Sequence, residues 1–151
     1  MKRLALLRTL LEREQKRRDE QMAAVRNAVA NAEAQQQQAD GLSGYRSEYC
    51  AKWSAQFQQA ATIEILRSYH GFLSRLDQAI AQQASVVEHA RRMVEAQRQR
   101  LVEREIRVAT VERLIQRREA MLAKLADRRD QKNLDELAQR LLSARSQTGL
   151  S

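Results

Sequence analysis

His70, His89 and Cys50 are the side chains of this 151-residue sequence whose types best suit catalysis or metal binding. A metal site needs several ligands at set spacings, and nucleophilic catalysis needs a nucleophile beside a base. None of the three residues stands in such a pattern, and no Gly-rich phosphate loop occurs. The sequence therefore predicts no enzyme, no metal and no cofactor. A lone cysteine allows no internal disulfide, so Cys50 is expected to pack near a helix contact, with a functional thiol as the weaker alternative.

Aromatic side chains gather in one short part of the chain. The six are Tyr45, Tyr49, Trp53, Phe57, Tyr69 and Phe72. The first four recur every four residues, and each such step advances about 40° around a helix, so the row cannot stay wholly within a narrow helix contact. Some rings must then be exposed. The cluster is interpreted either as an aromatic plug that secures a turn or as a docking patch for a protein, and both can hold.

Positive charge is concentrated in two segments. Residues 1–18 contain seven Lys or Arg against two Glu, and residues 91–129 contain twelve against six acids, within a net charge of +8. A solvated helix surface explains many of these charges, but neighbouring like charges cost stability unless something acidic binds there. The aromatic residues lie elsewhere and no nucleic-acid-binding motif occurs, so we expect no nucleic-acid partner. The opposite reading would predict a steeply salt-dependent affinity for DNA.

The elements that carry these groups are long helices. The chain has no Pro, four Gly, 43% apolar and 30% charged residues, which is typical of a coiled coil. From residue 66, every seventh residue is apolar: Leu66, Leu73, Ile80, Val87, Val94, Leu101, Val108, Ile115 and Leu122. The companion position, from Tyr69 to Leu125, is apolar at its ends and polar in the middle. This period predicts a left-handed coiled-coil seam along a helix at about 63–146.

A weaker apolar register runs through the first part of the chain, predicting a helix over about 2–58. It includes Leu4, Leu7, Leu11, Val25, Ala28, Ala32, Ala39, Leu42, Tyr49 and Trp53. Polar residues such as Glu14, Gln21 and Gln35 interrupt it, so we expect a thin, Ala-packed seam. Gly41 and Gly44 each cost about 1 kcal/mol relative to Ala within a helix, which leaves a bend or a close contact there open.

A reversal is expected near residues 58–63, with Thr62 as the helix N-cap and Glu64 in the first turn. The fold class is then all-α, a single antiparallel hairpin over 1–151 in which paired residue numbers add to about 121. Residues beyond about 120 overhang the first helix, and the two basic segments meet. The alternative is one helix of some 140 residues that dimerises in parallel, as in a scaffolding coiled coil with no ATPase partner.

The C-terminal segment changes phase. Leu134, Leu137, Ala138, Leu141 and Leu142 form an amphipathic stripe that does not continue the earlier register. A stripe without an intramolecular partner needs a cover, from another protein or from a fold-back onto the N-terminus, unless this is a frayed tail. No stretch has the length of apolar residues that a bilayer span needs, and no secretory signal is found, so we expect a cytoplasmic protein.

The chain resembles the stalk proteins of type III export, the flagellar FliJ proteins and their virulence counterparts of the YscO and HrpO type. The resemblance runs nearly end to end and is strongest at GLSGYRSEY (41–49), SYHGFLSRLDQAI (68–80) and RRDQKNLDELAQR (128–140). The start, MKRLALLRTLLEREQKRR, is closer to the virulence branch, and its strong positive charge departs from the family.

The resemblance implies a helical hairpin that inserts its termini into a hexameric export ATPase and contacts the cytoplasmic domain of the export-gate membrane protein, as well as some export chaperones. It would lie at the base of the apparatus, peripheral to the membrane only through its partners. Motif matches imply gate docking by Gln38, Leu42, Tyr45, Tyr49, Phe72, Leu76 and Ala79. The family's ATPase-facing end would correspond to the basic N-terminal arm and the overhang at 127–145, which implies ATPase docking by Leu4, Arg8, Leu11, Leu134, Leu137 and Leu141.

Overall fold

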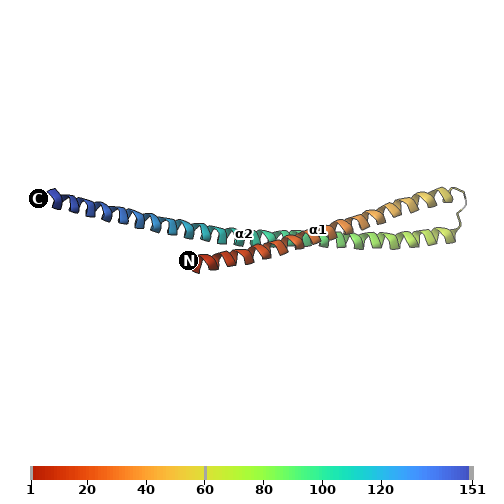
Figure 1. Cartoon of the computed structure of the whole chain (residues 1–151). Helices are drawn as coiled ribbons and strands as arrows, with labels where there is room; N and C mark the ends of the chain where they lie inside the picture. The colour runs from red at the N-terminus through yellow and green to blue at the C-terminus, as the bar shows by residue number, and fades with distance from the viewer. Residues whose placement is uncertain (1, 60, 150–151) are drawn as a thin grey trace. The chain divides into compact units, whose positions relative to one another are not determined.

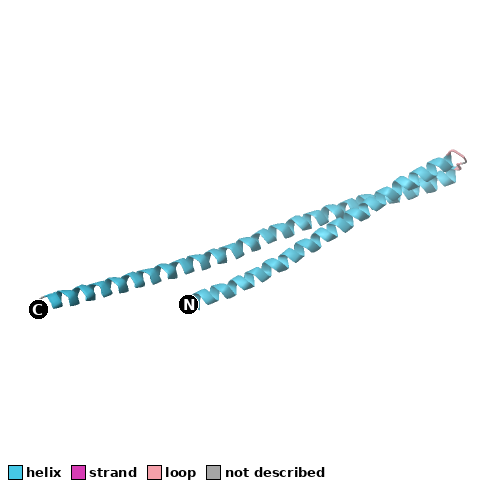
Figure 2. Cartoon of the chain, turned by 45° about the horizontal axis from the view of Figure 1, so that its top comes forward, coloured by secondary structure: helices cyan, strands magenta, loops and turns pink. Residues whose placement is uncertain are grey.

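The computed structural model describes residues 2–59 and 61–149, which form two long helices joined by a short turn. Helix α1 spans Lys2–Phe57 and helix α2 spans Ile63–Gly149, beside the expected 2–58 and 63–146. The described residues contain no strand (Figure 2). The helices pack against each other in opposite directions, with α2 continuing beyond α1 (Figure 1). The predicted all-α antiparallel hairpin is confirmed, although residues 1, 60, 150 and 151 lie outside the described part.

The chain divides into two compact units. Unit 1 consists of Met1–Lys16 and Glu105–Ser151, and unit 2 consists of Arg17–Arg104. Each unit therefore contains a segment of α1 and a segment of α2. Unit 1 holds most of the basic N-terminal segment and the C-terminal stripe, whereas unit 2 holds the turn and every aromatic residue.

The contact between the helices follows the heptad register of α2. Every predicted seam position from Leu66 to Leu122 is buried or half-buried. The buried apolar residues are Leu76, Val87, Ala90, Val94, Val108, Val111 and Ile115. No described side chain is completely buried, because a seam between two helices has only one layer and leaves every residue an open side.

On α1 the predicted register, apart from the buried Glu14, is half-buried from Leu4 to Trp53, including its other polar members. Gln56, one residue before the helix ends, is exposed. Glu14 is the one described residue of α1 that counts as buried, at 8% exposure. The interruptions seen in the sequence are thus part of the seam, and they do not mark breaks in the helix.

Polar contacts between the helices set their alignment. The pairs Gln21–Gln97, Gln35–Gln83, Arg46–Asp77 and Gln36–Arg91 in unit 2, and Arg8–Glu119 in unit 1, have residue numbers that add to between 118 and 127. The expected value was about 121. The antiparallel pairing is therefore within a few residues of the predicted one.

Thr62 begins α2 as expected. Its Oγ1 accepts a hydrogen bond from the backbone N–H of Ile65 at 3.3 Å, and its carbonyl oxygen accepts one from Leu66 N–H at 3.1 Å. Glu64 lies in the first turn, where a negative charge favours the helix dipole. A side-chain cap of this kind satisfies one of the four unpaired N–H groups at the helix start.

Gly41 and Gly44 lie within a continuous part of α1. A Cβ added at either position would meet nothing within 4 Å, and neither glycine has a positive φ. Of the two alternatives left open, a close contact is wrong, because the space that a Cβ would fill is empty at both glycines. Their backbone conformation is one that alanine adopts readily.

Candidate interaction surfaces

Tyr49 is the centre of the aromatic cluster in unit 2. Its ring centroid lies 4.6 Å from that of Phe72, 5.6 Å from Tyr69, 6.0 Å from Trp53 and 6.2 Å from Tyr45. These separations are those of favourable aromatic pairs, which contribute about 0.5–1.5 kcal/mol each beyond area burial. The cluster joins α1 to α2. Its rings lie four residues apart on α1 and three residues apart on α2, and this spacing brings them together.

Part of this cluster faces solvent. Tyr45 is 50% exposed and Ile65, beside Tyr69 in a shallow groove, is 38% exposed. Tyr49, Trp53 and the remaining rings are half-buried. The prediction that the row cannot stay wholly within the seam is confirmed. The same cluster thus stabilises the turn end of unit 2 and presents an aromatic surface.

Arg46 connects the cluster to α2. Its Nε donates to Asp77 Oδ1 at 2.6 Å and its Nη2 to Oδ2 at 3.4 Å, a bidentate pair across the helices. This hydrogen bond raises the pKa of the Arg46 guanidinium. Arg46 Nη1 also lies 3.9 Å from Cys50 Sγ. A side-chain hydrogen bond with Cys50 is the main reason that the pKa of the Tyr69 hydroxyl is raised, with burial as the second cause.

The residues predicted for gate docking all lie in unit 2. Tyr45 and Tyr49 of α1 contact Phe72 of α2, with the Tyr45 and Phe72 centroids 6.4 Å apart. Gln38 is exposed, and Leu42 and Ala79 are half-buried. Leu76 is only 7% exposed, so it packs in the seam and is not a surface residue.

The residues predicted for ATPase docking all lie in unit 1. Leu4 and Leu11 are half-buried in the helix contact, whereas Arg8 is exposed and forms an ion pair with Glu119 at 3.5 Å. Leu134, Leu137 and Leu141 are 61%, 53% and 65% exposed. The set thus contains two kinds of residue, namely seam leucines and uncovered leucines of the C-terminal stripe.

The overhang of α2 has no cover in the structure. Every described residue from 123 to 149 is exposed, and Leu142 is exposed to 66%. The helix remains continuous to Gly149. The fold-back onto the N-terminus is not found among the described residues. An exposed stripe of leucines at helical spacing is typical of a surface that another helix or groove covers.

Glutamine layers in the seam of unit 2 are the feature that sequence reasoning missed. Gln83, 9% exposed, and Gln97 occupy the seam position of α2 that was noted as polar, and each meets a glutamine of α1. The signal was present in the matching intervals, because Gln21 and Gln35 are as far apart on α1 as Gln83 and Gln97 are on α2. From the sequence, these glutamines were interpreted as interruptions of the apolar register.

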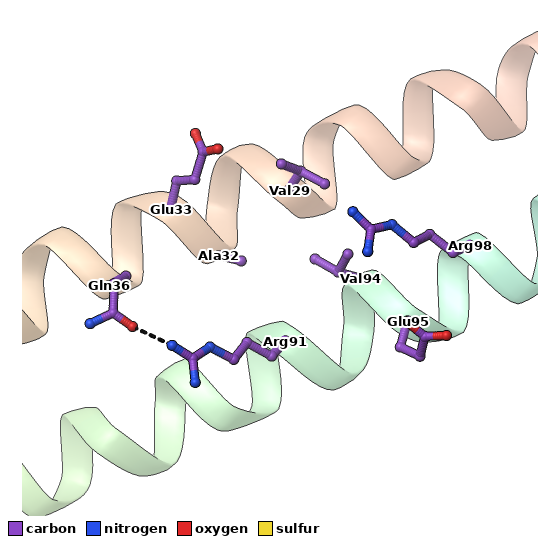
Figure 3. Close-up of a pocket in the computed structure, with 8 residues that line it drawn as sticks. All are labelled: Val29, Ala32, Glu33, Gln36, Arg91, Val94, Glu95 and Arg98. Carbon is purple, nitrogen blue, oxygen red and sulfur yellow. Dashed lines mark hydrogen bonds between the residues drawn. The ribbon is translucent and has the colours of Figure 1, made fainter.

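A groove of about 320 Å³ lies beside this seam, lined by residues of both helices (Figure 3). Val94 of α2 points toward α1, and Arg91 Nη2 donates to Gln36 Oε1 at 2.7 Å. Two arginines, Arg91 and Arg98, share the lining with two glutamates, Glu33 and Glu95. Their charges balance, so this groove attracts neither anions nor cations strongly.

Within the described part of the chain, no group of three or more His, Cys, Asp or Glu could hold a metal ion. Neither helix contains, among the residues described, an apolar stretch of the length that a bilayer span requires. The arrangement offers two exposed surfaces on a pair of helices. The class that this fold defines is an antiparallel helical hairpin that exposes an aromatic surface and a leucine stripe.

The family follows from comparison with known proteins. A model of the family described as "Flagellar FliJ protein" matches residues 2–147, so the chain belongs to this family, as its resemblance indicated. It is therefore a component of flagellar or type III protein export, and the family is a structural stalk component that is not a known enzyme. No curated protein and no solved structure matches the chain.

Proposed function

We propose that this protein is the central stalk of a bacterial type III export apparatus, in the cytoplasm at the base of the machine. It inserts into the hexameric export ATPase and contacts the cytoplasmic domain of the export gate, and thereby promotes protein secretion. The observation that carries the proposal is that one hairpin holds two chemically different surfaces. One is basic with an uncovered leucine stripe, in unit 1, and the other is aromatic, in unit 2.

The ATPase contact is assigned to unit 1. Leu134, Leu137 and Leu141 bury apolar area only when a partner covers them, because no part of the described chain does so. At about 25 cal/mol per Å² of apolar surface removed from water, three leucines are enough to anchor a contact. Arg8 would add attraction to acidic side chains of the ATPase.

A pull-down with the cognate ATPase tests this assignment. Full-length protein should recover the ATPase, and a form that ends after Leu125 should recover far less, because it lacks the stripe. The double variant Tyr45→Ala, Tyr49→Ala serves as the control, since both residues lie in the other unit, and it should recover the ATPase normally. Equal recovery by the full-length and truncated forms would contradict insertion through the overhang.

The gate contact is assigned to the aromatic cluster in unit 2. Tyr45 is half exposed while its neighbours hold it against α1 and α2, which is the usual setting of an interface anchor. The variant Tyr45→Ala, Tyr49→Ala should abolish secretion with helicity by circular dichroism unchanged. Loss of helicity would instead identify the cluster as a structural plug. Some export chaperones are proposed as further partners of the exposed helix surfaces.

The second candidate function is a scaffolding coiled coil that dimerises and has no ATPase partner. The exposed stripe of the overhang favours it, because two copies could cover each other's leucines. Light scattering of the isolated protein separates the two readings. A stable dimer that dissociates when residues after Leu125 are removed would support scaffolding, and a monomer would support the stalk.

A further inference from the structure

Unit 1 has a second surface that the family assignment does not explain. A groove of about 210 Å³ between α1 and α2 is lined by Arg3, Leu7, Leu114, Arg117, Arg118 and Met121. A second hollow of about 290 Å³ adjoins it on α1, because the two share Arg3 and Leu7, and it extends to Leu6 and Leu10. None of these residues is among those assigned to ATPase or gate docking.

The floor of this surface is apolar and uncovered. Leu6 is 69% exposed, Leu10 38%, Leu114 43% and Met121 53%. Leu6 and Leu10 are four residues apart on α1, and Leu114 and Met121 are seven apart on α2, so each pair lies along one face of its helix. The two faces together form an apolar strip that exposes large side chains to water in the free protein.

The border of the surface carries positive charges that no acidic residue of its lining neutralises. Arg3, Arg117 and Arg118 line it, and no acidic residue does. The groove beside the glutamine layers of unit 2 differs in this respect, since two glutamates accompany its two arginines. Three guanidinium groups around one apolar groove repel each other and favour a ligand that brings carboxylates.

Arg118 is independent evidence that the groove lacks an acceptor for its positive groups. Its Nε is buried and has no hydrogen-bond partner among the described residues. Its Nη1 contacts Met121 Sδ at 3.7 Å, and a thioether sulfur is a weak acceptor. A buried guanidinium donor without a good acceptor is unfavourable, and a carboxylate in the groove would supply the acceptor once the Arg118 side chain turns toward it.

We propose that this groove binds one acidic amphipathic helix of a partner protein. The apolar side chains of that helix would pack between Leu6 and Leu10 on α1 and Leu114 and Met121 on α2, and its Asp or Glu residues would pair with Arg3, Arg117 and Arg118. The site does not depend on the proposed stalk function, because it uses other residues.

The shape and charge of the groove select this occupant. A hollow between two helices accepts the ridge of a third helix, whereas a membrane surface is flat and requires residues that protrude. Nucleic acid would pair with the arginines but gains nothing from a floor of leucine and methionine. The overhang of a second copy is a poor match, because residues 127–145 contain five basic against four acidic side chains.

A synthetic helical peptide tests the proposal directly. The probe carries leucine at i, i+3, i+4 and i+7 spacing and glutamate at its remaining positions, with a fluorescent label, and is titrated against the full-length protein by anisotropy. Saturable binding is expected. Arg3→Glu with Arg117→Glu should weaken it by at least about tenfold, because two charge-assisted contacts become repulsive. Leu6→Ser with Leu10→Ser should weaken it comparably through the apolar floor.

Controls separate the site from general positive charge. Arg91→Glu with Arg98→Glu makes the same change of charge in unit 2 and should leave the affinity within about twofold. Circular dichroism should show unchanged helicity for each variant, and Leu6→Ser alone, at a largely exposed position, provides a second test if the arginine variant unfolds. A probe with alanine in place of leucine should bind at least about tenfold more weakly.

Four results would overturn the proposal. The first is that the leucine probe shows no saturable binding, and the second is that the alanine probe binds as tightly as the leucine probe. The third is that the charge variants of unit 1 and unit 2 lose the same affinity for the probe. The fourth is that the protein binds phosphatidylserine vesicles more tightly than the probe and that Arg3→Glu with Arg117→Glu abolishes this binding. The last would assign the surface to a membrane. Failure of ATPase recovery in the pull-down would not affect this titration, so the two proposals fail separately.

Discussion

Gln83 Nε2 lies 2.9 Å from the backbone carbonyl oxygen of Gln35 and 2.9 Å from its side-chain Oε1. The same arrangement recurs with the roles exchanged, since Gln21 Nε2 donates to Gln97 O at 3.0 Å and to Gln97 Oε1 at 2.6 Å. A polar layer inside an apolar seam is satisfied in one alignment only. These layers therefore select the register of α1 against α2 within unit 2.

The first prediction concerns this selection. Gln35→Leu with Gln83→Leu should leave the melting temperature unchanged or raised, because leucine packs well in a seam. It should also permit other alignments and oligomers, visible by analytical ultracentrifugation. Gln83→Ala alone should lower the free energy of unfolding by about 1–3 kcal/mol, since Gln35 loses its partner. The exposed Gln82→Leu is the control, and a strictly monomeric double variant would contradict a role in register.

Gly44→Ala should stabilise α1. The backbone at Gly44 is helical and a Cβ there meets nothing within 4 Å, so alanine removes conformational freedom from the unfolded chain without a clash. The expected gain is about 0.5–1 kcal/mol in the free energy of unfolding, measured by urea denaturation. Gly41→Ala should behave alike. A loss of stability would show that one of these positions is crowded by a partner or a second copy.

The raised pKa of Tyr69 predicts loss of stability at high pH. Its ordinary value is 10.0. Because the folded protein holds the proton more tightly than the unfolded chain, this contribution is fully present below pH 10.0 and is lost as the pH rises through the higher folded pKa. Thermal melts across this range should show the fall, and Tyr69→Phe should reduce it. Cys50→Ala removes the hydrogen bond that is the principal cause, and an unchanged tyrosinate titration in that variant would contradict it.

Removal of the overhang should leave the hairpin intact. Every described residue from 123 onward is exposed, so a form ending after Leu125 should melt at the same temperature as the full chain, with less total helical signal. This measurement also validates the truncation used in the ATPase pull-down. A melting temperature several degrees lower would mean that the C-terminal segment covers apolar surface in solution.

Much of this fold was predictable because the heptad pattern of a coiled coil depends on residues that are close together in the sequence. The sevenfold run from Leu66 to Leu122 predicted the buried face of α2, and Thr62 with its hydrogen bond to Ile65 N–H begins the helix as expected. The aromatic cluster was also predicted, since rings that flank a turn between two antiparallel helices must lie close together. The docking roles of Tyr45 and Leu134 remain predictions.

By itself, the sequence determined that the chain forms two helices, where they reverse and which face of each is apolar, because these depend on residue type and period over a few turns. Only the tertiary structure decided which polar seam residues meet, such as Gln35 with Gln83, and that Arg3 shares a groove with Arg117 and Arg118. A shift of one residue between the helices would change all of these partners. That alignment results from packing along both helices together, which no local pattern records.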